Sequence, residues 1–458
     1  MTTSSGMQWS SRLTFIMAAV GCAVGLGNIW LFPYLVGVNG GGAFVLVYLC
    51  AVLLLALPVL VAELMIGRRG AAGPPAAIAA VAKESGQPQA WSWMGVLLGG
   101  LGAVIALAFY GVAGGWAMAY SFKLAAGQLQ QIDAPGAELV FNVLNGSPGF
   151  LLPWVIAFLV TTVIISARGL QAGIEKAVKF MMPALFVMLV AMVVYAAVVG
   201  DFGRAASFLF RPDFSKLDSK TVLAAFGAAF FSVSVGITNM MAYGAYVDRT
   251  TRLPGTAAIV VAADTVVALL AGLAIFPLIF EYGLQPSGGP GLVFMTLPIA
   301  FGQIPGGLIF GTLFFVLLFF AALTSSIGML EAPVSWLRDA TSLSRRSAAM
   351  LAGSIGLVLG ILGALSFSTL ADIHPLGAIA MFEDKSFFDT YIHLVLNIMM
   401  PIGGILICVF AGWLVKRKFS REEFADGKDT ALYKTWLTIV RFVAPAILAL
   451  VLIDVATG

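Results

Sequence analysis

Charged side chains are scarce in this chain of 458 residues, because only 10% of them are Asp, Glu, Lys or Arg while 60% are hydrophobic. In an ordinary soluble domain about a quarter of the residues are charged. So few charges cannot cover so large an apolar content in water. Because a membrane-spanning helix needs about 20 residues, the apolar residues supply roughly eleven spans. The composition therefore predicts an all-α polytopic membrane protein that lies in a lipid bilayer.

Cysteine and histidine are also few, with three and two residues. Cys22, Cys50 and Cys408 all lie in apolar stretches, which excludes a disulfide framework. His374 and His393 lie near the outer ends of predicted spans, and no metal-ligand spacing or nucleophile motif joins them. We therefore expect a protein that is not an enzyme. The net charge of +3 is too small to indicate a nucleic-acid partner.

Eleven apolar segments are the predicted spans. They are residues 13–37, 41–67, 92–122, 150–167, 175–200, 221–247, 254–281, 306–337, 347–366, 388–415 and 433–455. Loops on the side of the amino terminus carry most of the Lys and Arg residues. Because such loops stay in the cytoplasm, we expect a cytoplasmic amino terminus, an outer carboxyl terminus and a location in the inner (plasma) membrane.

Two of these spans are interrupted at mid-length by residues that weaken a helix. The first contains Gly21-Cys-Ala-Val-Gly-Leu-Gly-Asn28, and the sixth contains Phe231-Ser-Val-Ser-Val-Gly-Ile-Thr238. Glycine costs a helix interior about 1 kcal/mol relative to alanine, and serine offers the backbone rival hydrogen bonds. Either segment alone also fits close helix packing. Because the two breaks are five spans apart, they favour an inverted-repeat transporter with its binding site at the midplane.

We accordingly predict a single transporter domain over residues 1–458 with a 5+5 inverted repeat. Residues 12–200 would form the first repeat, residues 221–416 the inverted second repeat, and residues 433–455 an extra helix. The apolar loop at 282–305 is expected either to pack down as an outer lid or to be an ordinary connection.

One acid and one run of hydroxyls interrupt the apolar interior. Asp264 lies among valines and alanines without a basic residue nearby, and charge at such depth is costly and usually functional. Thr324-Ser-Ser326 places three hydroxyls in succession within span eight. Oxygen ligands of this kind suit a small dehydrated cation such as sodium, although hydroxyls also join helices. Glu63 and Glu331 lie nearer to span ends, where a structural role is equally expected.

Several motifs resemble the neurotransmitter:sodium symporter family. The resemblance covers nearly the whole chain, and the eleven-span length is similar to the bacterial amino-acid branch of that family. The motifs are Trp9-Ser-Ser-Arg-Leu13, Gly21-Cys-Ala-Val-Gly-Leu-Gly-Asn-Ile-Trp-Leu-Phe-Pro33, Asn39-Gly-Gly-Gly-Ala-Phe44 and Phe320-Ala-Ala-Leu-Thr-Ser-Ser326.

The resemblance implies two sodium sites and a central substrate site. The first sodium would be bound by the substrate carboxylate and by Ala23, Asn28, Ser232 and Asp264. The second would be bound by Gly21, Val24, Ala321, Thr324 and Ser325. The substrate carboxylate would meet the amides of Leu26 and Gly27 and the Tyr110 hydroxyl, and its ammonium would meet carbonyls near Phe231 and Ser232, with Ser234 close by. The side-chain pocket would be lined by Ala106, Tyr110, Phe231, Ile237, Ser325 and Met329.

Three departures from the family pattern carry expectations of their own. Asp264 stands where many relatives have Asn, so we expect its charge to replace chloride. Leu31 stands where the family usually has the Arg partner of an outer-gate acid that aligns with Asp389, so the outer gate cannot be the usual ion pair. Phe231 and Tyr110, with Leu31 as a hydrophobic plug, would then close it.

The third departure concerns the inner gate. Gly6 falls where relatives have an inner-gate Arg, while Trp9, Tyr246 and Asp339 are retained. Inner closure is therefore expected to be looser than in those relatives.

The sequence thus predicts a sodium-coupled, chloride-independent symporter of neutral amino acids that works by alternating access. Ala106 and Ile237 replace bulkier residues, which favours a hydrophobic or aromatic substrate. Two alternatives stay open, namely a proton-coupled transporter with Asp264 as the proton carrier, and a membrane receptor that binds an amino acid without moving it. The oligomeric state is left open.

Overall fold

The computed structural model describes residues 8–284 and 291–457, and within these ranges it is built of helices without strands. Among the described residues, nine continuous helical stretches are long and apolar enough to cross a membrane. They are Gly42–Gly70, Gln89–Ala125, Pro148–Ala167, Leu170–Val199, Leu253–Glu281, Gly307–Ala340, Arg345–Leu365, Phe387–Leu414 and Ala431–Thr457. Each coincides with one predicted span.

The two remaining predicted spans are the broken ones. The first is a bent pair, α1 (Arg12–Ala23) followed by Gly27–Val38, with an angle of 50° between its halves. The sixth consists of two short helices, α12 (Ser219–Ser232) and α13 (Asn239–Gly244), joined by residues 233–238. The all-helical membrane fold is therefore confirmed, whereas the count of eleven crossings stays a prediction.

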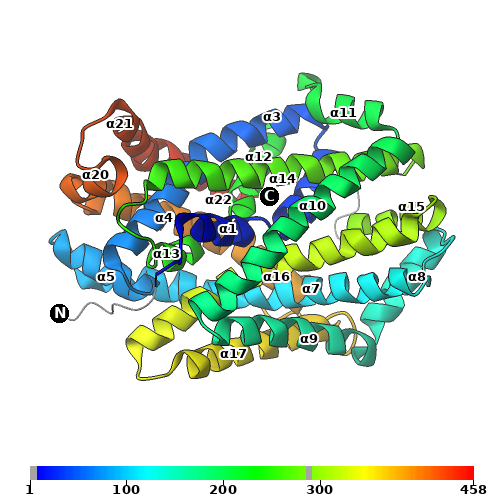
Figure 1. Cartoon of the computed structure of the whole chain (residues 1–458), viewed down its shortest axis with the longest axis horizontal. Coiled ribbons are helices and arrows are strands. Elements are labelled where there is room, and N and C mark those ends of the chain that lie inside the picture. Colours follow the sequence, from blue (N-terminus) through cyan, green and yellow to red (C-terminus); the bar gives the residue numbers. More distant parts are fainter. Residues whose placement is uncertain (1–7, 285–290, 458) are drawn as a thin grey trace.

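The connecting helices gather at opposite ends of the molecule (Figure 1). At one end lie α5 (Pro74–Glu84) and α20 (Arg417–Ala425), together with the beginning of the last span at α21 (Ala431–Thr438). At the other end lie α8 (Ala134–Gly146), α11 (Phe202–Phe210) and α15 (Leu297–Gln303). This segregation is what chain crossings that alternate in direction require.

The outer surface of the helix bundle is apolar. On α10 (Lys176–Val199), Val187, Val190, Val194 and Val198 are exposed and recur at helical spacing along one face. An exposed apolar stripe of this kind is unfavourable in water and is suited to contact with lipid chains.

Glycines allow the first break to approach its neighbours closely. α1 ends at Ala23, and Val24 adopts an extended conformation. A Cβ atom at Gly25 would lie 2.5 Å from Ser325 Oγ, and one at Gly27 would lie 3.2 Å from the Phe231 ring. Larger residues at these two positions would push the break away from α16 (Gly307–Ala340) and α12.

The second break is held by Glu63 of α4 (Leu57–Gly70). The backbone amide of Gly236 donates to Glu63 Oε1 at 2.6 Å, and that of Met241 donates to Oε2 at 3.3 Å. Because Glu63 is fully buried, these bonds satisfy both the carboxylate and amides that lack helical partners. The expected structural role of Glu63 therefore has a specific form, which is to join α4 to the second half of span six, α13.

The apolar loop at 282–305 is only partly described, since residues 285–290 lie outside the described ranges. Its second part, Leu292–Thr296 and α15, is largely buried. Phe294 packs against Trp116 and Tyr120 of α7 (Ala103–Ala125), with ring centroids 5.3 and 5.4 Å apart. This part of the loop packs down onto the bundle, as the lid interpretation requires.

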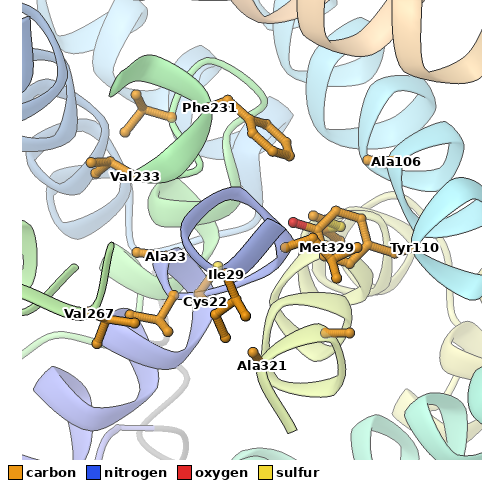
Figure 2. Packing of buried hydrophobic residues seen from close by; sticks show 14 of the residues in the cluster. Cys22, Ala23, Ile29, Ala106, Tyr110, Phe231, Val233, Val267, Ala321 and Met329 are labelled. Atoms are coloured by element: carbon orange, nitrogen blue, oxygen red, sulfur yellow. The ribbon is translucent and has the colours of Figure 1, made fainter. Parts of the chain in front are cut away.

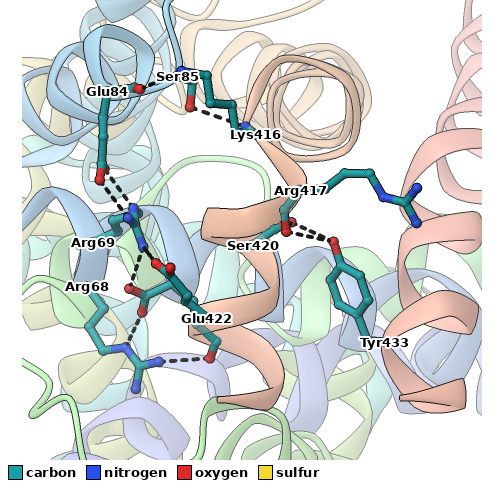
Figure 3. Close-up of polar contacts among 10 residues, drawn as sticks. Arg68, Arg69, Glu84, Ser85, Lys416, Arg417, Ser420, Glu422 and Tyr433 are labelled. Carbon is teal, nitrogen blue, oxygen red and sulfur yellow. Dashed lines mark hydrogen bonds and ion pairs between the residues drawn. The ribbon is translucent and has the colours of Figure 1, made fainter. Parts of the chain in front are cut away.

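A network of ion pairs joins α4, α5 and α20 (Figure 3). Arg68 Nε lies 2.7 Å from Glu423 Oε2, and both side chains are buried. Arg69 contacts Glu84 Oε1 at 2.6 Å and Glu422 Oε2 at 3.2 Å. The hydrogen bonds from Arg69 hold the pKa of the Glu84 carboxyl below its usual range.

Candidate functional site

The first polar cluster of the interior surrounds Asp264 of α14 (Leu253–Glu281). Asn28 Nδ2 lies 2.9 Å from Asp264 Oδ1 and 2.9 Å from Ser232 Oγ. Ser232 Oγ donates to Asp264 Oδ2 at 2.6 Å, and the Tyr48 hydroxyl donates to Ser232 Oγ at 3.0 Å. Asp264, Asn28 and Tyr48 are fully buried and Ser232 is 1% exposed. Three of the four residues predicted for the first sodium site thus meet around one carboxylate.

The fourth predicted residue, Ala23, is the last residue of α1 and lies directly before the break. No ion pair between described residues involves Asp264. The Asn28 amide oxygen accepts from the Gly25 amide at 3.0 Å, so its nitrogen is the atom that faces Asp264. A cation at this point requires that amide to turn its oxygen inward, which an Asn side chain achieves by rotating about χ2.

The second cluster joins the break of span one to α16. Ser325 Oγ donates to the carbonyl of Val24 at 3.2 Å and to that of Gly21 at 3.4 Å. Thr324 Oγ1 donates to the Ala321 carbonyl at 3.1 Å. All five residues predicted for the second sodium site therefore lie together, and they present two hydroxyls and three carbonyls.

The third hydroxyl of the run does not join this cluster. Ser326 Oγ donates to the Ala322 carbonyl of its own helix at 2.8 Å. Of the three hydroxyls, only those of Thr324 and Ser325 lie on the side of α16 that faces the break, because successive helical residues point about 100° apart.

Four of the residues predicted for the substrate pocket are seen around the first break in Figure 2, namely Ala106, Tyr110, Phe231 and Met329. The Tyr110 hydroxyl lies beside the first break, 3.0 Å from the point that a Cβ atom at Gly25 would occupy. The Ser234 hydroxyl donates to the Cys22 carbonyl at 3.2 Å. The other lining residues are buried and come from α7, α12, the second break and α16; they are Ala106, Phe231, Ile237 and Met329.

A cavity of about 490 Å³ leads towards this pocket. Its walls are mainly apolar and include Leu26, Leu31 and Phe231, which places the predicted plug residue at the edge of the access route. Ile392 of α18 (Phe387–Ile392) also lines it. Ile392 is a gate candidate that the sequence reasoning missed.

Asp389 lies elsewhere. It accepts a hydrogen bond from Ser386 Oγ at 2.7 Å at the start of its own helix and lines a neighbouring cavity, which shares Ile392 and Asn397 with the first. The structure therefore does not bring the predicted gate acid together with Leu31. Ile392 occupies the next helical turn, which carries it to the cavity that Leu31 lines.

The side of the pocket that faces the amino terminus is closed. Trp9 Nε1 donates to the Tyr243 carbonyl at 3.1 Å, and the Trp9 amide donates to the Tyr246 carbonyl at 3.3 Å. The Tyr246 hydroxyl donates to Glu331 Oε1 at 2.8 Å. Arg345 binds both oxygens of Glu331, at 3.0 and 2.5 Å.

This closure differs in part from the expected one. Trp9 and Tyr246 take part, but Asp339 accepts from the Gly73 amide at 2.6 Å and lies apart from that network. Arg345 was missed because it belongs to the next helix, and Gly6 lies outside the described residues.

Comparisons with known proteins identify the family. The family model described as the sodium:neurotransmitter symporter family matches residues 7–131 and 145–457. The chain belongs to this family. An uncharacterized sodium-dependent transporter of Bacillus subtilis (strain 168) is 36% identical over 99% of this chain and 98% of its own length. One of Haemophilus influenzae (strain ATCC 51907 / DSM 11121 / KW20 / Rd) is 33% identical over 99% of both chains.

A solved structure of the same family confirms the architecture. The crystal structure of MhsT in complex with L-phenylalanine matches with a TM-score of 0.89 and 39% sequence identity. The match covers 98% of this chain and 100% of that chain. The predicted membership of the sodium:neurotransmitter symporters, the helical membrane fold and the expectation of a sodium-dependent symporter that is not an enzyme are thereby confirmed.

Proposed function

We propose that this sodium-dependent symporter carries neutral amino acids with a large apolar or aromatic side chain, by alternating access and without chloride. The observation that carries the proposal is the pair of oxygen clusters, Asp264–Asn28–Ser232 and Ser325–Val24–Gly21, on the two sides of one helix break. Unwound backbone of this kind is tolerated at membrane depth where it lines a binding site.

Coupling would arise at the first cluster. A sodium ion held by Asp264, Ser232, the Asn28 oxygen and the Ala23 carbonyl would be completed by the carboxylate of the substrate. Because the ion and the substrate then touch, each raises the affinity of the other by the same factor. The amides of Leu26 and Gly27 and the Tyr110 hydroxyl would hold the rest of that carboxylate, and carbonyls near Phe231 would accept from the ammonium.

The second cluster would act on conformation. A sodium ion between Gly21, Val24, Ala321, Thr324 and Ser325 would join the broken first span to α16. Its binding energy would favour the arrangement seen here, in which the inner side is closed and the apolar cavity reaches Phe231.

The substrate class follows from the pocket lining. Ala106, Ile237 and Met329 offer apolar surface without a charged side chain to pair with a charged substrate. The structurally similar protein MhsT has been solved with L-phenylalanine, which supports phenylalanine as the first candidate. Asp264 supplies a fixed negative charge beside the first cation, so a bound chloride would be redundant. Outer closure would be hydrophobic, with Leu31, Phe231 and Tyr110 above the substrate.

The proposal also covers the internal repeats and the orientation of the protein in the membrane. Residues 12–200 and 221–416 would be the inverted repeats within one domain over residues 1–458, and residues 433–455 an added helix. The protein would lie in the inner (plasma) membrane with the amino terminus in the cytoplasm and the carboxyl terminus outside.

The experiment is flux into proteoliposomes after a thermal-shift screen of the amino acids in sodium buffer. We expect stabilisation by phenylalanine or a similar amino acid, and its accumulation under a sodium gradient with chloride replaced by gluconate. Uptake that persists without sodium would favour proton coupling, and binding without flux would favour a receptor. A large loss on removing chloride would refute the role given to Asp264.

A further inference from the structure

Two side chains on the inner half of span six are buried without a hydrogen-bond partner. Neither the amide nitrogen nor the amide oxygen of Asn239 has a partner among the described residues, and the Tyr243 hydroxyl has none either. Both residues are fully buried. Unpaired buried polar groups destabilise a fold and are rare in native proteins, so they require an explanation.

The residue before them is strained. Thr238 has a φ of 59°, a left-handed conformation that β-branched residues rarely adopt. Its hydroxyl is also unpaired and lies against Gly99, where any Cβ atom would collide with it. The inner end of the break is therefore held in an unfavourable arrangement, as is common at sites where a protein changes state.

Tyr243 lies between the central pocket and the inner closure. The Tyr243 hydroxyl is 3.4 Å from the point that a Cβ at Gly328 would occupy, and Gly328 precedes the pocket residue Met329. On its other side, the Tyr243 ring meets the Trp9 ring edge-on, with centroids 5.3 Å apart. Asn239 is four residues before Tyr243 and shares its face of α13.

We propose that Asn239 and Tyr243 form an inner relay site, which takes the charged head of the amino acid between the central pocket and the cytoplasm once Trp9 withdraws. The amide nitrogen and the phenol donate hydrogen bonds, which suits a carboxylate, and the amide oxygen accepts, which suits an ammonium group. The inference rests on the proposed function, because it takes an amino acid as the transported substrate.

The chemistry of the relay site suits weak, transient binding of the substrate. Asn239 and Tyr243 carry no charge, so their hydrogen bonds to a zwitterion are weaker than those between two charged groups. The relay site therefore shortens the path through an apolar region without trapping the substrate. The central pocket differs, because there Asp264 and the proposed cations supply full charges.

The test separates binding from transport in Asn239→Leu and Tyr243→Phe, which keep size and remove polarity. Sodium-dependent phenylalanine affinity is measured on purified protein, and initial uptake is measured in proteoliposomes. We expect affinity within about twofold of the wild-type value and uptake lower by about fivefold or more, a change of about 1 kcal/mol in the barrier. Unchanged uptake in both variants overturns the proposal, whereas a wild-type protein that binds no amino acid overturns the proposed function instead.

Tyr120→Phe is the matched control. Tyr120 is equally buried and its hydroxyl also lacks a partner, but it lies on α7 against Phe294 and Phe315, near α15. We expect its uptake to equal that of the wild type. An equal loss in Tyr120→Phe would mean that any unpaired phenol affects packing, and the relay site would be refuted.

A second measurement distinguishes the substrate from water as the occupant. Thiol labelling of Cys22 without sodium or amino acid, with Cys50 and Cys408 replaced by serine, reports how often the inner side opens. The relay site predicts that Asn239→Leu labels like its parent. If labelling changes by the same factor as uptake, the two side chains serve only to hydrate the open state, and the proposal fails.

Discussion

Asp264→Asn tests the charge at the first cluster most directly. The substitution keeps the size of the side chain and removes its charge, at a carboxylate held 2.9 Å from Asn28 Nδ2 and 2.6 Å from Ser232 Oγ. Two unit charges about 4 Å apart interact by about 4 kcal/mol at an effective dielectric constant of about 20. The amide dipole of asparagine and water recover part of this, so we expect sodium affinity to fall by at least about tenfold, or about 1.4 kcal/mol.

The assay is the sodium dependence of phenylalanine uptake in proteoliposomes, in chloride and in gluconate. Wild-type protein should give the same curve in both anions, whereas the variant should require more sodium and regain part of its activity in chloride. Asp454→Asn is the matched control, because Asp454 of the last helix lines the cavity of about 490 Å³ and lies outside the cluster. An unshifted sodium curve in Asp264→Asn would refute the electrostatic role of this residue.

Three further predictions concern other contacts. Thr324→Ala should raise the sodium concentration for half-maximal uptake several-fold and leave the order of amino-acid preference unchanged; altered preference would place Thr324 in the pocket. Glu63→Gln weakens the charge-assisted bonds to the Gly236 and Met241 amides. We therefore expect the free energy of unfolding to fall by about 1–3 kcal/mol and the Tm to fall with it; an unchanged Tm would contradict this. Glu84 contributes stability where its carboxyl is charged, because Arg69 lowers its folded pKa. That contribution is present above the unfolded pKa of about 4.3 and is lost as pH falls through the folded pKa. The Tm difference between the wild type and Glu84→Gln should therefore vanish in acid. A difference that persists would exclude the ion pair as its cause.

The breaks of both special spans could be predicted from sequence because glycine and serine act locally on a helix. The pairing of Glu63 with the second break could not, since 173 positions separate Glu63 from Gly236 and only the packing of α4 on α13 brings them together. The left-handed Thr238 was equally unexpected, because nothing about a threonine marks it for that conformation.

Some gate residues could likewise be predicted from the sequence, and others could not. Trp9 and Tyr246 were found from motifs, and the structure brings them together. Asp389 was taken from the family resemblance, whereas the position that lines the cavity beside Leu31 is Ile392, one turn further along α18. Helical phase near the end of a span cannot be read from composition, since it depends on where the helix begins; here α18 starts at Phe387 with Ser386 as its cap.

The hydrogen bonds of Glu63 have a consequence at the end of the molecule that we propose faces the cytoplasm. Because Glu63 joins α4 to the inner half of span six, and Arg68 on the same helix joins α4 to α20, α4 acts as a lever between the pocket and the surface. When the break rearranges, α20 must tilt with it or lose the Arg68 contact. A spectroscopic label on the exposed Lys418 of α20 would therefore report the state of the buried pocket from the surface.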